Sequence, residues 1–132
     1  MSTLNRWLSI VFVLSSLLYS GLSCAMDIKR TGTFSNIEFH AESGDILGME
    51  LRIVRIRSGY VGMLQICEGG PGDIIMVEPK FTGDKLHFLI QHKWYNGSFD
   101  GVIENDGVRG QFTFSSNVGE MKFMPRTKSY WD

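Results

Sequence analysis

Cysteine is almost missing from this chain of 132 residues, which contains only Cys24 and Cys67. Cys24 lies in an N-terminal segment that we expect to be removed, so Cys67 would have no partner for an intramolecular disulfide. The sequence also lacks the Cys-x-x-Cys and His-x-His spacings of metal sites, and no Cys-His-Asn pattern surrounds Cys67. We therefore interpret Cys67 as a small apolar side chain in a strand and predict no catalytic residue, no metal site and no cofactor.

Proline and net charge are scarce as well. The chain has three prolines but 15 glycines, and its formal net charge is −1. Frequent glycine with little proline indicates tight turns rather than disorder. A net charge near zero gives no signal for binding to nucleic acid or to an anionic membrane. No stretch shows the 3.6-residue period of a helix. With 43% hydrophobic residues, we expect one all-β domain with an ordinary core.

Residues 1–25 resemble a secretory signal peptide. Arg6 precedes an apolar run from Trp7 to Tyr19, and Ser23-Cys24-Ala25 fits the small-x-small rule for cleavage after Ala25. The run is shorter than the roughly 20 apolar residues that span a bilayer. A lipoprotein acylated on Cys24 and an uncleaved anchor remain as alternatives, and only lipidation of Cys24 would add a membrane partner. All three readings place the domain, residues 26–132, in the periplasm or outside the cell.

The stretch from Gly97 to Phe114 predicts a β-hairpin. Asp106-Gly107 is typical of a type I′ turn and would set Phe99 opposite Phe114, Ile103 opposite Gly110 and Gly101 opposite Phe112. Opposed residues share a face, so one face would carry phenylalanine and isoleucine while Glu104 meets Arg109 on the other. Large side chains opposite glycines are typical of strongly curved sheets.

Six more turns or loops divide the rest of the domain into strands. A three-residue loop, Ser43-Gly44-Asp45, would set Phe39 opposite Met49; Ser58-Gly59 would set Arg55 opposite Gly62; and Asn96-Gly97 would set His92 opposite Gly101. One uninterrupted strand is expected over residues 74–81. Eight short strands joined mostly by hairpins predict an eight-stranded antiparallel up-and-down barrel, with a two-sheet β-sandwich as the alternative.

Four segments carry a resemblance to a known family: Ser43-Gly-Asp-Ile-Leu-Gly-Met-Glu-Leu-Arg-Ile-Val54, Gly59-Tyr-Val-Gly, Glu68-Gly-Gly-Pro71 and Ser129-Tyr-Trp-Asp132. They resemble a family of small uncharacterised secreted proteins of Gram-negative bacteria. The resemblance covers most of the domain and implies a location outside the cytoplasm. Because that family has no assigned activity, the resemblance implies no functional residues.

One candidate binding site lies on the inward face. Arg55, Tyr60 and His92 would gather at the mouth of a barrel, where a cation, a phenol and an imidazole can orient a small amphipathic ligand. The alternative is that the arginine is solvated near a turn and that His92 is a hydrogen-bonded core residue.

A second candidate lies on the outward face of the hairpin around Ser58-Gly59. Val54, Ile56, Val61 and Met63 would cluster there, with Phe34 reaching Val54 from the neighbouring strand. An exposed apolar cluster of this kind usually marks a partner surface. The C-terminal residues Tyr130 and Trp131 would instead cover the cluster if the tail folds over it.

These features favour a non-enzymatic extracytoplasmic binding module that docks a protein partner through the outward cluster. The alternative is a carrier that binds a small amphipathic molecule inside the barrel, and a hydrolase is the least favoured class. The three histidines, His40, His87 and His92, fall on separate strands or opposite faces, which gives no basis for a metal centre.

Overall fold

The computed structural model describes residues 27–132, and every regular element in this range is a β-strand in an antiparallel sheet. The first sheet has β1 (Gly32–Ser35) and β2 (Glu38–His40) beside β3 (Asp45–Ile56), then β4 (Gly59–Gly69) and β5 (Ile74–Val77). The second has β6 (Lys80–Thr82), β7 (Lys85–Gln91), β8 (Asn96–Ile103) and β9 (Gly107–Phe114), with β10 (Asn117–Val118) and β11 (Lys122–Pro125) both beside β9. Nothing in residues 27–132 forms a helix long and apolar enough to cross a membrane.

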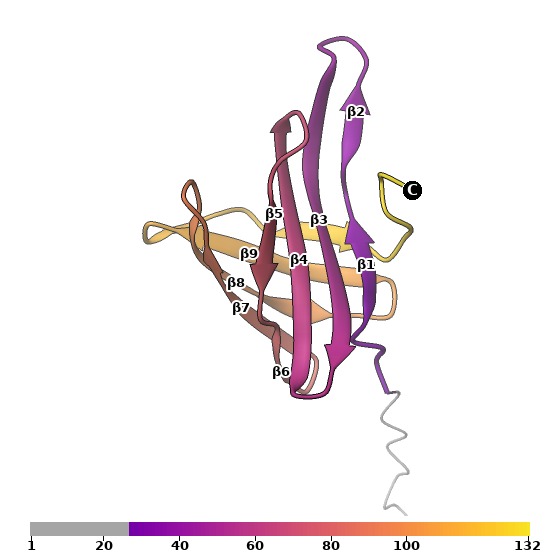
Figure 1. The fold of residues 1–132 in the computed structure, drawn as a ribbon, viewed down its shortest axis with the longest axis vertical. Coiled ribbons are helices and arrows are strands. Elements are labelled where there is room, and N and C mark those ends of the chain that lie inside the picture. Colours follow the sequence, from indigo (N-terminus) through magenta and orange to yellow (C-terminus); the bar gives the residue numbers. More distant parts are fainter. Residues whose placement is uncertain (1–26) are drawn as a thin grey trace, which may run out of the picture.

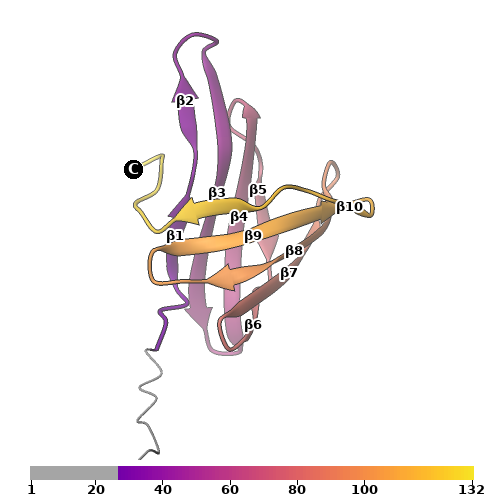
Figure 2. The ribbon, with the colours of Figure 1, turned by 180° about the vertical axis from the view of Figure 1, so that it is seen from behind.

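The two sheets are stacked, with their strands crossing steeply. Figure 1 shows the first sheet in front with its long strands upright, and Figure 2, seen from behind, shows β7, β8 and β9 running across in front of that sheet. The end of the β2–β3 hairpin projects beyond the second sheet. Crossed sheets of this kind are joined at corners where the chain passes from one sheet to the other.

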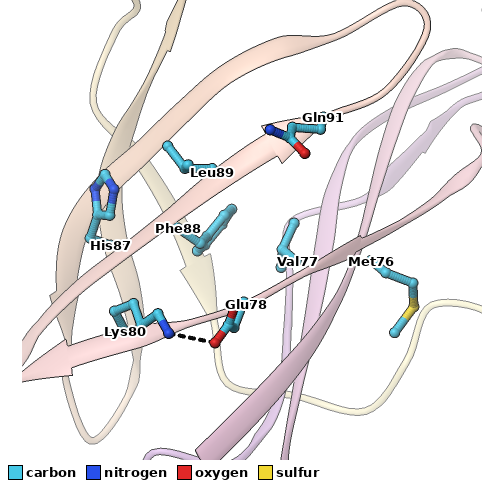
Figure 3. Close-up of a pocket in the computed structure, with 8 residues that line it drawn as sticks. All are labelled: Met76, Val77, Glu78, Lys80, His87, Phe88, Leu89 and Gln91. Atoms are coloured by element: carbon cyan, nitrogen blue, oxygen red, sulfur yellow. Dashed lines mark hydrogen bonds and ion pairs between the residues drawn. The ribbon is translucent and has the colours of Figure 1, made fainter.

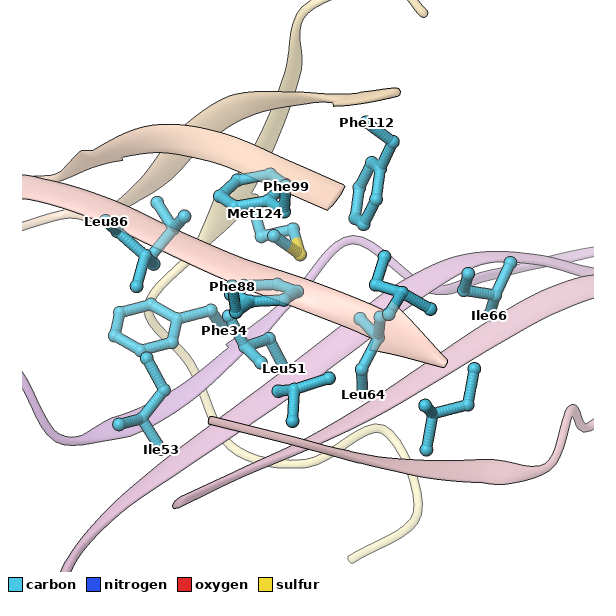
Figure 4. Close-up of a cluster of buried hydrophobic side chains, with 14 of the residues drawn as sticks. Phe34, Leu51, Ile53, Leu64, Ile66, Leu86, Phe88, Phe99, Phe112 and Met124 are labelled. Carbon is cyan, nitrogen blue, oxygen red and sulfur yellow. The ribbon is translucent and has the colours of Figure 1, made fainter. Parts of the chain in front are cut away.

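Apolar side chains from both sheets fill the space between the layers (Figure 4). In β7, Leu86, Phe88 and Ile90 are buried while the residues between them are exposed, as the two-residue period of a half-buried strand requires. The buried cluster comprises Phe34, Leu51, Ile53, Leu64, Ile66, Ile75, Val77, Leu86, Phe88, Ile90, Phe99, Ile103, Val108, Phe112 and Met124.

The sheets do not close into a barrel in the part of the chain that the structure describes, so the barrel prediction is wrong and the sandwich alternative fits. A backbone bridge between Phe34 and Arg126 joins them along one side. Along the other side, the single strand expected over residues 74–81 is split at Glu78-Pro79. Val77 pairs with Gly62 in the first sheet, whereas Lys80 pairs with His87 in the second. Proline has no N–H for a ladder, and the chain changes sheets at this point.

The β8–β9 hairpin forms as predicted, but its register differs by two residues. Phe99 pairs with Phe112, Gly101 with Gly110 and Ile103 with Val108. The turn residues are Asn105 and Asp106, neither of which has a positive φ. Because a shift of two keeps each side chain on its face, Phe99, Ile103 and Phe112 are buried as expected.

The turn between β7 and β8 lies three residues before the predicted Asn96-Gly97. His92 and Tyr95 exchange backbone hydrogen bonds of 2.8 and 3.2 Å, so Lys93 and Trp94 form the turn. His92 therefore lies at the end of the hairpin and not opposite Gly101, which pairs with Leu86.

The register of the first hairpin, β2–β3, differs from the predicted one by an odd number of residues, so side chains expected on one face lie on the other. His40 pairs with Asp45 across a four-residue loop, and Phe34 pairs with Leu51. Phe39 is consequently exposed and Phe34 is completely buried. The β3–β4 hairpin has Arg57 and Ser58 in its turn, and Arg55 lies opposite Tyr60, not Gly62.

Candidate functional site

The outer face of the first sheet carries a row of apolar side chains. Val54 lies directly opposite Val61, and Met63 lies beside Met76 of β5. We name this group the outer apolar patch; it comprises Val54, Ile56, Val61, Met63, Ile74 and Met76. Val54, Val61 and Met63 are half-buried, whereas Ile56, Ile74 and Met76 are 43%, 57% and 59% exposed. The patch therefore reaches β5, at the edge of the sheet.

Four of the five residues predicted for this surface belong to the outer apolar patch. The fifth, Phe34, was assigned to it wrongly, because the corrected register turns its side chain into the core. Ile74 and Met76 were missed. Their alternation with the buried Ile75 and Val77 in β5 is the sequence signal that places them on the outer face.

The C-terminal tail lies on the same outer face but binds a different part of it. Ser129 donates from Oγ to Glu50 Oε1 at 2.6 Å, and the Tyr130 N–H donates to Glu50 Oε2 at 2.8 Å. The indole Nε1 of Trp131 donates to Gln65 Oε1 at 2.6 Å. Glu50 and Gln65 are directly opposed on β3 and β4, and each is only 8% exposed.

Two polar side chains on the sheet thus fix the tail beside the outer apolar patch. Burying a carboxylate is unfavourable unless hydrogen bonds compensate it, and the tail supplies two donors to Glu50. Ile56, Ile74 and Met76 remain exposed with the tail in place. The tail therefore covers the polar pair and leaves these apolar side chains open to solvent.

The structure does not bring Arg55, Tyr60 and His92 together. Arg55 donates to the Tyr60 hydroxyl at 3.1 Å and lies over its ring, and Tyr60 packs edge-on against Phe81. Phe81 pairs with the beginning of β7, whereas His92 follows the end of that strand. The two groups therefore lie at opposite ends of β7.

His92 belongs to a polar cluster at the end of the β7–β8 hairpin. Its Nε2 lies 3.2 Å from Asp73 Oδ2, and its ring stacks on Tyr95. The Tyr95 hydroxyl donates to Glu68 at 2.8 Å. That hydrogen bond, with a smaller contribution from burial, raises the pKa of Tyr95. The cluster links the loop after β4 to the hairpin.

Another histidine pair lies on the outer face of the second sheet, where His87 Nδ1 is 2.7 Å from Asp100 Oδ1. Both side chains are about half exposed, and such pairs contribute little to stability. Among residues 27–132, no three His, Cys, Asp or Glu side chains come close enough to hold a metal ion. Cys67 is buried.

No protein-family model, curated protein or solved structure matches this chain.

Proposed function

We propose that this protein is a non-enzymatic binding module that docks a protein partner on the outer apolar patch. The observation that carries the proposal is the exposure of Ile56, Ile74 and Met76 on a sheet face that the protein's own tail leaves uncovered. Contiguous exposed apolar side chains are typical of interaction surfaces. We also propose that the protein acts outside the cytoplasm, on the basis of the signal-like residues 1–25, which lie outside the described residues.

The charge on this face defines the partner further. Arg52 is exposed, lies opposite Met63, and forms no ion pair with any residue in the range 27–132. A partner surface that is apolar and has a carboxylate at its margin would match both the outer apolar patch and the charge of Arg52. Such a charge would mainly affect the association rate and its dependence on salt.

The test is capture of a partner from extracytoplasmic extract, followed by titration of the purified partner against variants. Val61→Asp places a charge in the middle of the patch and should abolish binding. Met121→Asp is the matched control, because Met121 is 57% exposed but lies outside the patch. Arg52→Glu should weaken binding most at low salt. A folded Val61→Asp variant that binds the partner as tightly as the parent would refute the proposal.

A further inference from the structure

The side of the sandwich that the β5–β6 corner spans contains a groove (Figure 3). The groove encloses about 480 Å³ between β5 with the following corner and the exposed edge of β7. Its lining residues are Met76, Val77, Glu78, Lys80, His87, Phe88, Leu89 and Gln91. No strand of residues 27–132 pairs with this half of β7 on the groove side, because the β6 ladder stops at the pair Lys80–His87.

The direction of the β7 backbone groups follows from the ladder. His92 and Tyr95 exchange both hydrogen bonds, and such pairs alternate with pairs that exchange none. Ile90 and Phe88 therefore direct their N–H and C=O groups toward β8, where they pair with Gly97 and Phe99. Leu89 and Gln91 direct theirs away from β8, into the groove.

β6 cannot extend to satisfy these groups. The chain before Lys80 passes through Pro79 and Glu78 into the first sheet, where Val77 pairs with Gly62. Two N–H and two C=O groups of β7 are thus left at an open edge. Unpaired edges of this kind are templates for another extended backbone.

The residues that line the groove indicate the chemistry of the ligand that it would bind. Leu89 and Met76 are each 59% exposed, and the buried Phe88 and Val77 line the groove beneath them. The charges of Glu78 and Lys80 pair with each other across the corner. The groove therefore offers apolar contact and backbone hydrogen bonds, with no net charge to attract a charged ligand.

We propose that this groove binds an extended, uncharged peptide segment of a partner, which adds as a strand to the Leu89–Gln91 edge. Backbone hydrogen bonds would supply affinity, and alternate apolar side chains would lie against Leu89 and Met76, as in other strand-addition complexes. Met76 belongs to the outer apolar patch and also lines this groove, but neither site needs the other.

A second copy of the chain is the competing occupant, and the size of the edge argues against it. β6 blocks one end of the free edge, and the Lys93–Trp94 turn ends the other. Pairing two such edges would join only two residues from each copy, and so short a ladder cannot by itself supply the roughly 1,200 Å² of contact that stable interfaces bury. A flexible peptide can continue along the groove beyond the free edge, whereas the β7 edge of a second folded copy cannot.

Hydrogen exchange on the ¹⁵N-labelled protein tests the first step. We expect the Leu89 and Gln91 amides to exchange much faster than those of Phe88 and Ile90, because only the latter pair with β8. Equal protection of all four amides would show that the edge is already paired and would overturn the proposal.

Peptide selection tests the second step, with a displayed library of random heptapeptides as the probe. We expect the recovered peptides to be uncharged and to shift the Leu89 and Gln91 amide resonances. Leu89→Pro removes one groove-facing N–H without touching the β8 ladder, and it should weaken binding about fivefold to tenfold, the worth of a hydrogen bond. Leu89→Thr keeps the N–H and is the matched control, and Gln91→Pro serves if Leu89→Pro does not fold.

Three results would overturn the proposal: no recovered peptide, peptides that bind both proline variants as tightly as the parent, or a dimer that the proline variants abolish. Val61→Asp should leave peptide binding unchanged. Failure of the outer apolar patch and failure of the groove are thereby distinguished.

Discussion

The guanidinium carbon of Arg126 lies 4.7 Å from the centre of the Phe34 ring, at the side where the two sheets are bridged. The same side chain donates to four backbone carbonyls: Nη1 to Thr31 at 2.7 Å, Nη2 to Lys29 at 2.6 Å and to Glu104 at 3.5 Å, and Nε to Asn105 at 3.0 Å. One arginine therefore joins the N-terminal segment, the β8–β9 turn and the end of β11.

Arg126→Lys should lower the free energy of unfolding by about 1–3 kcal/mol, because a lysine ammonium cannot present the planar set of donors that reaches all four carbonyls. Urea unfolding measures the loss. Arg109→Lys is the matched control, since Arg109 also lies over a ring, that of Phe123, but is exposed and pairs with Glu104 at 3.8 Å. Equal losses in both variants would contradict the bridging role of Arg126.

Gly110→Ala should also destabilise the protein, by about 1–3 kcal/mol, as expected of overpacking. A Cβ on Gly110 would approach the Phe99 ring within 2.4 Å and the Asp100 carbonyl oxygen within 2.6 Å. Gly70→Ala should be nearly neutral, because a Cβ there meets no atom within 4 Å. Thermal melts compare the two, and similar melting temperatures would show that Phe99 does not cover Gly110.

Trp131→Phe should lower the free energy of unfolding by about 1 kcal/mol, because Gln65 loses the indole donor. Tyr130→Phe should change it little, since Tyr130 binds Glu50 through its backbone N–H. Denaturant titration of both variants provides the measurement. If neither substitution alters stability, the tail is not held on the sheet in solution.

Mass spectrometry of the exported protein should find Met26 as its first residue, as expected for cleavage after Ala25. An acylated Cys24 at the N-terminus would establish the lipoprotein alternative. Retention of residues 1–25 would indicate an uncleaved anchor.

Side-chain faces were easier to predict than turns. The β3–β4, β7–β8 and β8–β9 registers differ from prediction by even numbers of residues, so the two-residue alternation still places Leu51, Leu64 and Phe99 in the core. The turns were predicted wrongly from their sequences: Asp106-Gly107, for example, does not form the predicted turn with positive φ. Positive φ at two consecutive residues occurs instead at Ser115 and Ser116, with φ of 49° and 67°, where the sequence has no glycine or asparagine.

The errors that mattered for the site came from one loop and one corner. A four-residue loop in place of a three-residue one moved Phe34 from the outer face to the core. The corner at Glu78-Pro79 decides between barrel and sandwich, since it sends Val77 and Lys80 into different sheets. Local sequence cannot show either result, because both depend on packing between strands far apart in the chain. The same applies to the tail, whose partners Glu50 and Gln65 are about 80 and 66 residues away.

The contact from Arg126 to Lys29 spans 97 residues of sequence and bears on the order of folding. A chain is synthesised from its N-terminus, and contacts between distant residues form late because a large loop must close first. The segment before β1 gains its arginine partner only when nearly the whole domain has emerged. Until then the β1 side of the first sheet lacks its bridge to the second, so this edge of the nascent chain stays open to pairing with other chains.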